Sequence, residues 1–415
     1  MTLHSPTRRN MLLASGVLFT WPFLPRLALA EGRDPRFLTV VLRGALDGLA
    51  AVAPIGDPAW VALRGDKGLR LDGATPALPL DSFFALNPAM PNLHRLYKAG
   101  QAIIVHAAAT PYRERSHFDG QDVLESGLAA PGTAESGWLN RALATIEPGS
   151  RADTRGRQVF AVGPITPLVV RGAAPILSWV PPRLPPVSDD TTMRLLDLYH
   201  HTDPALARVL EDRLGLAALA RAGGMETAPR NAGPVIQVGG INQVRAYFSE
   251  VAGAAAKFLA SATGPRVGAL ALDGWDTHIN EGAVGGRLSA LLGSLDGAIG
   301  AIEGNMGDAW KETVVAMVTE FGRTAHVNGN DGTDHGTGTV ALLVGGALKG
   351  GRVIADWPGV KEADLYEKRD LKPTTDLRAV LKGVLKDHLR VDEKVLATNV
   401  FPDSATVKPM AGLVG

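Results

Sequence analysis

Cysteine is absent from this chain of 415 residues. No disulfide bond can therefore form, even in an oxidising compartment. The absence also excludes cysteine metal ligands, a thiol nucleophile and any aldehyde derived from cysteine. A hydrolytic nucleophile would have to be a serine, a threonine or a water activated by a metal ion.

Neither sign of charge is in excess, because 42 Lys and Arg residues face 42 Asp and Glu residues. The first thirty residues carry three arginines and no acid, so the rest of the chain is slightly acidic. This balance argues against nucleic acid or an anionic membrane surface as the main partner. Beyond residue 30 no apolar run is long enough to cross a bilayer, and we expect no membrane span in the mature chain.

The first thirty residues have the pattern of an export signal. Residues 7–13 read TRRNMLL, a twin-arginine pattern, and an apolar stretch covers residues 11–29. Small residues at 28 and 30 provide a cleavage site. The alternative, a membrane anchor, is disfavoured because two prolines and an arginine interrupt the stretch. We therefore predict a signal over residues 1–30, export by the twin-arginine machinery, and a periplasmic or secreted protein.

Residues 31–415 alternate between short apolar runs and amphipathic helical patterns, and we predict a single α/β domain. Strands are expected at 37–42, 102–106, 158–162, 167–170, 267–272, 313–318 and 340–344. Helices are expected at 93–97, 137–143, 193–222 with a break at Pro204, 241–262 and 287–302. The proline-rich residues 175–186 are expected to form a surface loop. Residues around 173–235 either form a helical insertion or belong to the domain.

A polar, glycine-rich stretch, residues 319–339, joins two of the expected strands. Asp334 and His335 are adjacent oxygen and nitrogen donors within it. Such donors suit a divalent metal, zinc first, with calcium, magnesium and manganese as alternatives and one or two ions. The competing interpretation is a turn with an Asx-type bond and a surface histidine. Glu320 and Arg323 are candidates for orienting ligands or binding substrate.

Three more potential ligands follow strand-like runs. Asp47 comes after the first expected strand, and Asp276 and His278 come after a later one. The last two are two residues apart, so they would point to the same side of an extended segment. Each also has a structural interpretation: Asp47 would end its strand in an Asp-Gly turn, and the Asp276–His278 pair, taken alone, would be structural. Because the carboxyl ends of parallel strands meet at one edge of a sheet, the accumulation of these side chains predicts a metal site there.

Ser116 begins an expected helix and has two interpretations. In the first it caps the helix, because Asp119 follows at capping-box spacing. In the second it is a nucleophile at a helix N-terminus, where backbone amides favour an anionic group. Arg113 and Arg115 would then add charge-assisted bonds to a phosphate or sulfate. For His117 a solvated helix side chain is expected, with a metal ligand as the alternative.

Six stretches together resemble one bacterial family: VVLRGALDGL (40–49), RSHFDGQDVLESG (115–127), GWDTH (274–278), TEFGRT (319–324), GTDHG (332–336) and LKPTTDLRAVL (371–381). The family consists of twin-arginine-exported proteins that share domain of unknown function 1501. It is similar to the alkaline phosphatase-like superfamily of phosphatases, sulfatases and phosphodiesterases. The resemblance implies a three-layer α/β/α sandwich with a mostly parallel central sheet and two metals at the strand ends.

The resemblance also implies ligand sets. One metal would be surrounded by Asp47, Ser116, Asp334 and His335, and the other would be held by Asp276 and His278. The chain departs from the superfamily, whose second metal commonly takes a further histidine well after the Asp-His pair. Here the later histidine is His388, in a Leu- and Lys-rich helix, and we expect it to be structural. His326, His106 or Glu320 would have to substitute.

These features predict an exported, metal-dependent hydrolase of phosphate or sulfate esters. Its partner would be a small anionic ester or a polymer of the cell envelope. Ser116 would be the nucleophile, with Arg115, Glu320 and Arg323 as further catalytic or substrate-binding candidates. The alternative is a non-catalytic binding or assembly protein of the cell envelope that retains the fold, with or without a structural metal.

Overall fold

The computed structural model describes residues 33–132, 134–146, 159–163, 165–179, 195–196, 198–200, 202–222 and 241–415. The expected signal over residues 1–30 lies outside these ranges. So do Gln158, residues 180–186 of the expected surface loop, and much of the stretch around 173–235.

Within the described residues, nine strands form the central sheet. Their spatial order is β11 (Arg352–Ile354), β5 (Ala102–Ala109), β10 (Thr339–Val344), β9 (Thr313–Val318), β1 (Arg36–Arg43), β8 (Val267–Asp273), β6 (Val159–Val162) and β7 (Ile176–Trp179), with β12 (Thr375–Asp376) paired to β5. β10 is antiparallel to both β9 and β5, whereas the other pairings are parallel. The sheet is therefore mostly parallel, with β10 reversed.

β1 is a central strand that is buried on both faces. Leu38, Val40 and Leu42 belong to the apolar core on one face of the sheet, and Phe37 and Val41 to the core on the other. An uninterrupted apolar run is what a parallel strand covered on both faces requires. The paired strands β8 and β9 flank β1 in parallel register.

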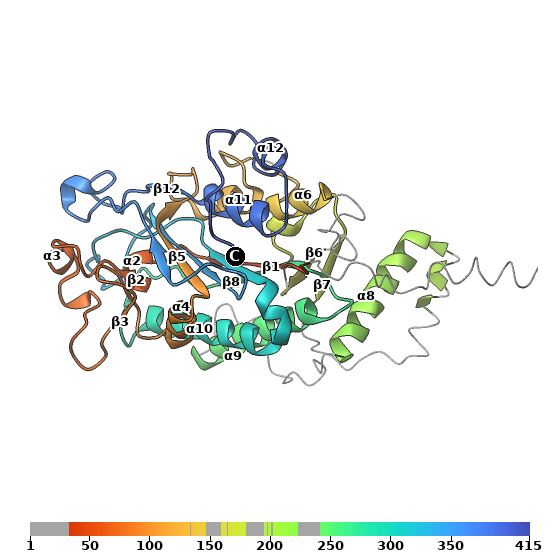
Figure 1. The fold of residues 1–415 in the computed structure, drawn as a ribbon, viewed down its shortest axis with the longest axis horizontal. Helices are drawn as coiled ribbons and strands as arrows, with labels where there is room; N and C mark the ends of the chain where they lie inside the picture. The colour runs from red at the N-terminus through yellow and green to blue at the C-terminus, as the bar shows by residue number, and fades with distance from the viewer. Residues whose placement is uncertain are drawn as a thin grey trace, which may run out of the picture. The chain divides into compact units, whose positions relative to one another are not determined.

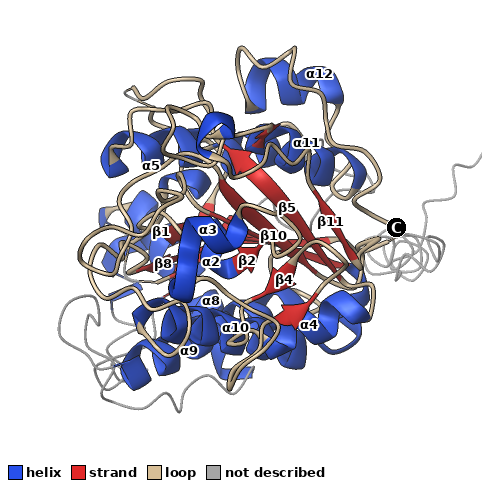
Figure 2. Cartoon of the chain, turned by 90° about the vertical axis from the view of Figure 1, so that its left-hand side faces the viewer, coloured by secondary structure: helices blue, strands red, loops and turns tan. Residues whose placement is uncertain are grey.

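Helices cover both faces of the sheet (Figures 1 and 2). On one face, α4 (Pro91–Lys98), α9 (Ile241–Ala260) and α10 (Arg287–Met306) share a core with Leu38 of β1. On the other, α6 (Trp138–Ala144) and α11 (Leu377–Asp387) share a core with Phe37. These layers form the three-layer α/β/α sandwich that the sequence predicted, and the fold class is confirmed.

Smaller elements complete the described chain. The helices are α2 (Gly48–Ala51), α3 (Trp60–Arg64), α5 (His117–Ser126), α8 (Pro204–Ala222) and α12 (Glu393–Val395), with short helical turns η2 (Gly65–Lys67), η3 (Leu168–Val170), η5 (Gly307–Glu312), η6 (Glu362–Asp364) and η7 (Leu396–Val400). A second sheet, counted over the same residues, has three strands in the order β2 (Val52–Ala53), β4 (Ala85–Leu86) and β3 (Leu78–Pro79).

Two local predictions from the sequence are wrong. Residues 167–170 were expected to be a strand but form the 3-10 turn η3 after Pro167. Proline has no N–H to donate to a strand ladder, so it favours this outcome. Residues 176–179 were expected to lie in a loop but form β7, parallel to β6. The prolines of that stretch flank the strand and do not interrupt it.

The reversal of β10 decides where the loop between β9 and β10 lies. β9 ends at the carboxyl edge of the parallel strands, and β10, running the other way, begins at the same edge. Residues 319–338 therefore leave and re-enter the sheet at that edge, next to the segments that follow β1 and β8. Among the helices of the described ranges, none is long and apolar enough to cross a membrane.

Candidate metal centre

Four segments converge at the carboxyl edge of the sheet: the turn after β1, the start of α5, residues 274–278 after β8, and residues 319–338. Contacts tie them together. The backbone N–H of Gly44 donates to Glu320 Oε1 at 2.8 Å. His335 Nδ1 lies 3.0 Å from the carbonyl oxygen of Arg115. Side chains far apart in the sequence are thus brought to one place.

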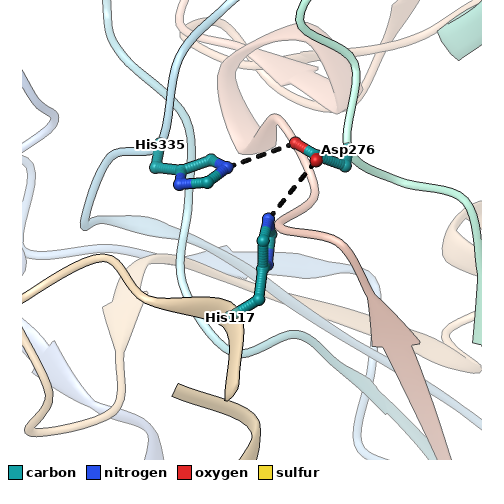
Figure 3. Close-up of side chains that lie close together, drawn as sticks. All are labelled: His117, Asp276 and His335. Atoms are coloured by element: carbon teal, nitrogen blue, oxygen red, sulfur yellow. Dashed lines mark hydrogen bonds and ion pairs between the residues drawn. The ribbon is translucent and has the colours of Figure 1, made fainter. Parts of the chain in front are cut away.

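Asp276 lies at the centre of this convergence (Figure 3). Its Oδ1 is 2.9 Å from His278 Nε2 and 3.3 Å from His335 Nε2. The same oxygen accepts a hydrogen bond of 2.6 Å from Arg323 Nη1. Its Oδ2 is 3.5 Å from His117 Nε2. Three histidines therefore present the same ring nitrogen to one carboxylate.

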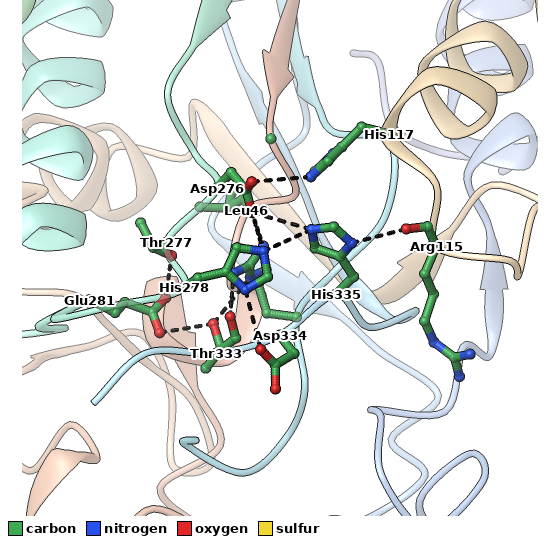
Figure 4. A network of polar contacts seen from close by, with 12 residues as sticks. Leu46, Arg115, His117, Asp276, Thr277, His278, Glu281, Thr333, Asp334 and His335 are labelled. Carbon is green, nitrogen blue, oxygen red and sulfur yellow. Dashed lines mark hydrogen bonds and ion pairs between the residues drawn. The ribbon is translucent and has the colours of Figure 1, made fainter. Parts of the chain in front are cut away.

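The opposite nitrogen of each ring is held by an oxygen that accepts its proton, and Figure 4 shows the acceptors of His278 and His335. These Nδ1 contacts are His117 to Glu320 Oε1 at 2.8 Å, His278 to Asp334 Oδ1 at 3.2 Å, and His335 to the Arg115 carbonyl at 3.0 Å. With a proton on Nδ1, each ring leaves its Nε2 as the atom able to bind a cation placed beside Asp276. Metal-binding histidines are oriented in this way, with the second nitrogen donating to a carboxylate or a carbonyl.

These residues fit a metal ion. Ligand atoms of His117, Asp276 and His335 all lie within 4.8 Å of one another. The contacts of 2.9 to 3.5 Å around Asp276 are close to the ~3.3 Å between donor atoms in a tetrahedral site with bonds of about 2.0 Å. His117 Nε2 is buried and has no hydrogen-bond partner among the described residues. His278 Nε2 and His335 Nε2 are 3.0 Å apart, where two lone pairs need a proton or a cation between them.

The carboxylates and the basic groups of the site shift one another's pKa values. Burial raises the pKa of Asp276, but contacts with His117, His335 and Arg323 outweigh burial and lower it. Contacts with Asp276 and Glu320 raise the pKa of His117 to about 9, against the effect of burial. A metal ion would compete with the proton that His117 carries.

Glu320 and Arg323 contact the cluster, and both are buried. Glu320 Oε1 accepts from His117 and from the Gly44 amide, and Oε2 accepts from Thr319 at 2.9 Å. Burial raises the pKa of Glu320, but its bonds, the one from His117 first, lower it. Arg323 Nη1 donates to Asp276. Glu320 thus holds His117 and Arg323 holds Asp276, and neither candidate has an exposed surface for substrate.

Ser116 is the N-cap residue of α5, as its spacing predicted, but its side chain forms no capping hydrogen bond. Its backbone N–H donates to Tyr112 Oη at 3.1 Å, and Asp119 contacts the same tyrosine. Ser116 stands between two residues that touch the cluster: Arg115, through its carbonyl oxygen, and His117. Ser116 is therefore next to the cluster in the chain, and its hydroxyl does not cap the helix.

The guanidinium groups of Arg113 and Arg115, which were expected to bind an anion, form hydrogen bonds with other groups of the protein. Arg115 Nε donates to Asp370 Oδ2 at 2.9 Å, and Nη2 donates to Glu367 Oε2 at 2.5 Å. In Figure 4 this side chain points away from the histidines. Arg113 Nη1 donates to the backbone carbonyl oxygens of Thr110 and, at 2.7 Å, Tyr112. Because both arginines bond to other protein groups, this arrangement does not agree with the expectation that they bind a phosphate or sulfate.

Asp47 does not belong to the cluster. It is the N-cap of α2, accepting from the amides of Leu49 at 2.9 Å and Ala50 at 3.1 Å. Arg64 Nη1 donates to its Oδ2 at 2.8 Å. The Asp47 and Arg64 side chains are 1% and 3% exposed. The Asp47 carboxylate, which was predicted to be a metal ligand, thus accepts hydrogen bonds from two backbone amides and a buried arginine.

The structure does not separate the ligands into the two sets that the resemblance implied. Asp334 accepts from His278, although the two were assigned to different metals. His335 likewise contacts Asp276. The described residues bring these four together as one cluster, which fits one ion better than two.

His117 is the residue that the sequence analysis missed. It was expected to be solvated, but Glu320 and Asp276 hold its two nitrogens and its ring stacks on Phe321 at a centroid distance of 5.1 Å. One feature of the sequence could have indicated that His117 belongs to the site. It directly follows Ser116, at the start of a helix that comes after a strand. It is one of three residues whose ligand atoms lie within 4.8 Å of one another, whereas His106 and His326 are not in that group.

The other histidines lie away from the cluster. His106 is buried and contacts the Val52 carbonyl at 2.8 Å. His388 is buried, and its Nε2 lies 2.9 Å from the carbonyl oxygen of Arg36, which agrees with the structural role expected for it. His326 is exposed. Only Glu320, among the three expected substitutes, touches a residue of the cluster in the described structure.

Several solved structures are similar to this chain at low identity. A phosphonate monoester hydrolase of Agrobacterium radiobacter is 12% identical, with a TM-score of 0.31 over 77% of this chain and 70% of that one. The PsFucS1 sulfatase from Pseudoalteromonas sp. is 13% identical, with a TM-score of 0.36 over 84% and 68%. The C-terminal periplasmic domain of EcEptC from Escherichia coli, in complex with Zn, is 11% identical, with a TM-score of 0.33 over 76% and 74%. At such values the likeness says nothing about activity.

No curated protein matches the chain. A family model described as "Protein of unknown function (DUF1501)" matches residues 100–400, which include α5, both Asp-His pairs and the stretch between β9 and β10. The match covers well over half of the chain. The chain therefore belongs to the DUF1501 family.

Proposed function

We propose that this protein is an exported, metal-dependent hydrolase of phosphate or sulfate esters, and that His117, Asp276, His278 and His335 hold its metal ion. One observation carries the proposal. Each of the three imidazole rings has its Nδ1 tied to an acceptor oxygen, so that its Nε2 converges on Asp276. Export rests on the twin-arginine pattern of residues 7–13.

The donor set favours zinc among the metals expected from the sequence. Three imidazole nitrogens and one carboxylate suit zinc. Calcium and magnesium prefer oxygen ligands, and the carboxylates of Glu320 and Asp334 are already committed to histidine nitrogens. A bound zinc ion would act as a Lewis acid on an ester oxygen and lower the pKa of a hydroxyl or water.

Ser116 is the candidate nucleophile. Its neighbours on both sides contact the cluster, and its hydroxyl makes no capping bond. Attack by the serine oxygen on phosphorus or sulfur would form a covalent ester with the enzyme and release the alcohol. Water would then hydrolyse that ester and restore the serine.

Arg369 supplies positive charge beside the cluster. Its Nη2 donates to the carbonyl oxygen of His335 at 2.8 Å, and its Nη1 lies 3.5 Å from Asp370 Oδ1. The side chain is 40% exposed, whereas Arg323 is buried. Asp276 and Asp334 are also partly open to solvent, so an ester could reach the site. Arg369 is therefore the arginine best placed to bind the anionic group of a substrate.

The proposal is tested by metal content together with turnover. The full chain, purified without chelators, should contain about one zinc ion per molecule, and chelation should remove activity on aryl phosphates or aryl sulfates that zinc restores. His335→Ala should lower both zinc content and turnover. His326→Ala is the matched control, because this histidine is exposed and should leave both unchanged.

Two results would count against the proposal. A wild-type protein that neither contains nor takes up a divalent metal contradicts the metal centre. A protein that binds zinc but turns over neither ester class would favour the alternative, a non-catalytic envelope protein that has kept the fold.

A further inference from the structure

A carboxylate with no assigned function lies beside the two loops that carry the ligands. Glu281 is in the segment between β8 and α10, and it is 4% exposed. A buried carboxylate requires hydrogen-bond donors, because transfer out of water is otherwise strongly unfavourable. Its donors are therefore informative about what it does.

Both donors of Glu281 are threonines next to ligands in the sequence (Figure 4). Thr277 Oγ1 donates to Oε1 at 2.9 Å, and Thr333 Oγ1 donates to Oε2 at 2.9 Å. Thr277 lies between the ligands Asp276 and His278. Thr333 precedes Asp334 and the ligand His335. Each oxygen of the carboxylate thus holds one of the two loops.

A third group joins these bonds. Thr333 Oγ1 accepts from Arg323 Nε at 3.1 Å and donates to Glu281 Oε2, so the hydroxyl links the arginine to the carboxylate. The same arginine donates to Asp276 through Nη1. A continuous chain of hydrogen bonds therefore runs from Glu281 through Thr333 and Arg323 to the central carboxylate of the cluster.

The backbones of the two loops also approach closely. The Glu281 N–H donates to the Asp331 carbonyl at 2.8 Å, and the Thr333 N–H donates to the Thr277 carbonyl at 3.2 Å. A Cβ added at Gly332 would lie 2.2 Å from the His278 carbonyl oxygen, so only glycine fits there. The two loops are thus packed directly against each other, with Glu281 bonded to a side chain of each.

We propose that Glu281 is a positioning residue that sets the distance between the Asp276–His278 pair and the Asp334–His335 pair, and thereby sets the affinity of the metal centre. It does so through the hydroxyls of Thr277 and Thr333, without contact with the ion. This inference rests on the metal site of the proposed function. The competing explanation is that Glu281 only satisfies two buried hydroxyls and contributes to folding alone.

The two explanations differ in metal affinity, which is measured on the full chain by competition for zinc with a chelator of known affinity. Glu281→Gln keeps the volume of the side chain but offers only one acceptor oxygen to the two threonines. We expect zinc affinity to fall by about 10- to 100-fold, as for other partners that orient metal ligands. Thr333→Val should do the same, and Thr333→Ser, which keeps the hydroxyl, should restore affinity.

Asp296 provides the matched control. It is a buried carboxylate that accepts from the amides of Asn92 and Leu93, on the helical layer that contains α4 and α10. Asp296→Asn should lower the melting temperature and leave zinc affinity unchanged. A purely structural role for Glu281 would produce this same pattern.

The outcomes separate this inference from the proposed function. A folded Glu281→Gln protein with wild-type zinc affinity overturns the inference while the metal centre stands. A wild-type protein that binds no zinc overturns both. If Glu281→Gln does not fold, the comparison of Thr333→Val with Thr333→Ser decides, because unequal zinc affinities support the inference and equal ones reject it.

Discussion

Replacement of Asp47 tests whether this carboxylate is a ligand, as the strand-end pattern predicted, or the partner of a buried arginine. Asp47→Asn keeps the N-cap, since asparagine caps a helix as well as aspartate. It removes the negative charge that faces Arg64 across 2.8 Å, with both side chains almost fully buried. Leaving one member of a buried ion pair unpaired typically costs about 3–5 kcal/mol. Asp47→Ala should cost roughly 1 kcal/mol more, because the cap is lost as well.

The assay is denaturant unfolding of the full chain at neutral pH, with the zinc content of the folded protein measured in parallel. We expect Asp47→Asn to lower the free energy of unfolding by about 3–5 kcal/mol. Zinc content should not change, because Asp47 is outside the cluster. The double variant Asp47→Asn with Arg64→Met should be less destabilised than the sum of the single variants, since neither charge is then buried alone.

Two results would refute this reasoning. One is a loss below about 1 kcal/mol for Asp47→Asn, which would mean that the buried pair is not formed. The other is a fully stable Asp47→Asn protein that has lost its zinc. That outcome would return Asp47 to the role of ligand.

Three further predictions concern pH, the nucleophile and export. His106 is fully buried, and burial lowers its pKa from 6.5 to about 4, so the unfolded chain takes up a proton that the folded chain does not. The free energy of unfolding should therefore fall by up to about 3 kcal/mol between pH 6.5 and pH 4, and a folded His106→Gln variant whose stability has the same pH dependence would contradict this. Because the Ser116 hydroxyl forms no capping bond, Ser116→Ala should change stability by less than about 0.5 kcal/mol but abolish turnover. Ser116→Asn should also fold and lose activity, and wild-type turnover in either variant rejects the serine as nucleophile. Replacing Arg8 and Arg9 together by lysine should leave uncleaved precursor in the cytoplasm, and normal periplasmic accumulation in cell fractions would reject the export route.

The central strands could be predicted because burial on both faces leaves a clear pattern. β1, β8 and β9 are uninterrupted apolar runs, and the sequence located each of them. The reversal of β10 could not be predicted, because an apolar run has the same pattern in either direction. β7 was missed because flanking prolines obscure a four-residue strand.

For the site, the expectation that the ends of parallel strands meet at one edge of the sheet identified Asp276, His278, Asp334 and His335. These four residues lie together in the structure, and their binding of a metal stays a prediction. His117 was missed because a histidine in the first turn of a helix is usually solvated. Its partners, Glu320 and Phe321, come from a loop about two hundred residues later, which local patterns cannot bring near. The same limitation hid the Arg64 partner of Asp47.

The antiparallel pairing of β9 with β10 has a consequence for how the ion enters and leaves. The excursion over residues 319–338 begins and ends on neighbouring strands, and Met317 pairs with Leu342 close to where it leaves and re-enters the sheet. It can therefore open while the parallel core stays intact, because local openings need far less free energy than global unfolding. Zinc exchange would then be governed by fluctuations of this loop. If the site holds zinc, release of the ion into a chelator should be much faster than hydrogen exchange of the β1 amides.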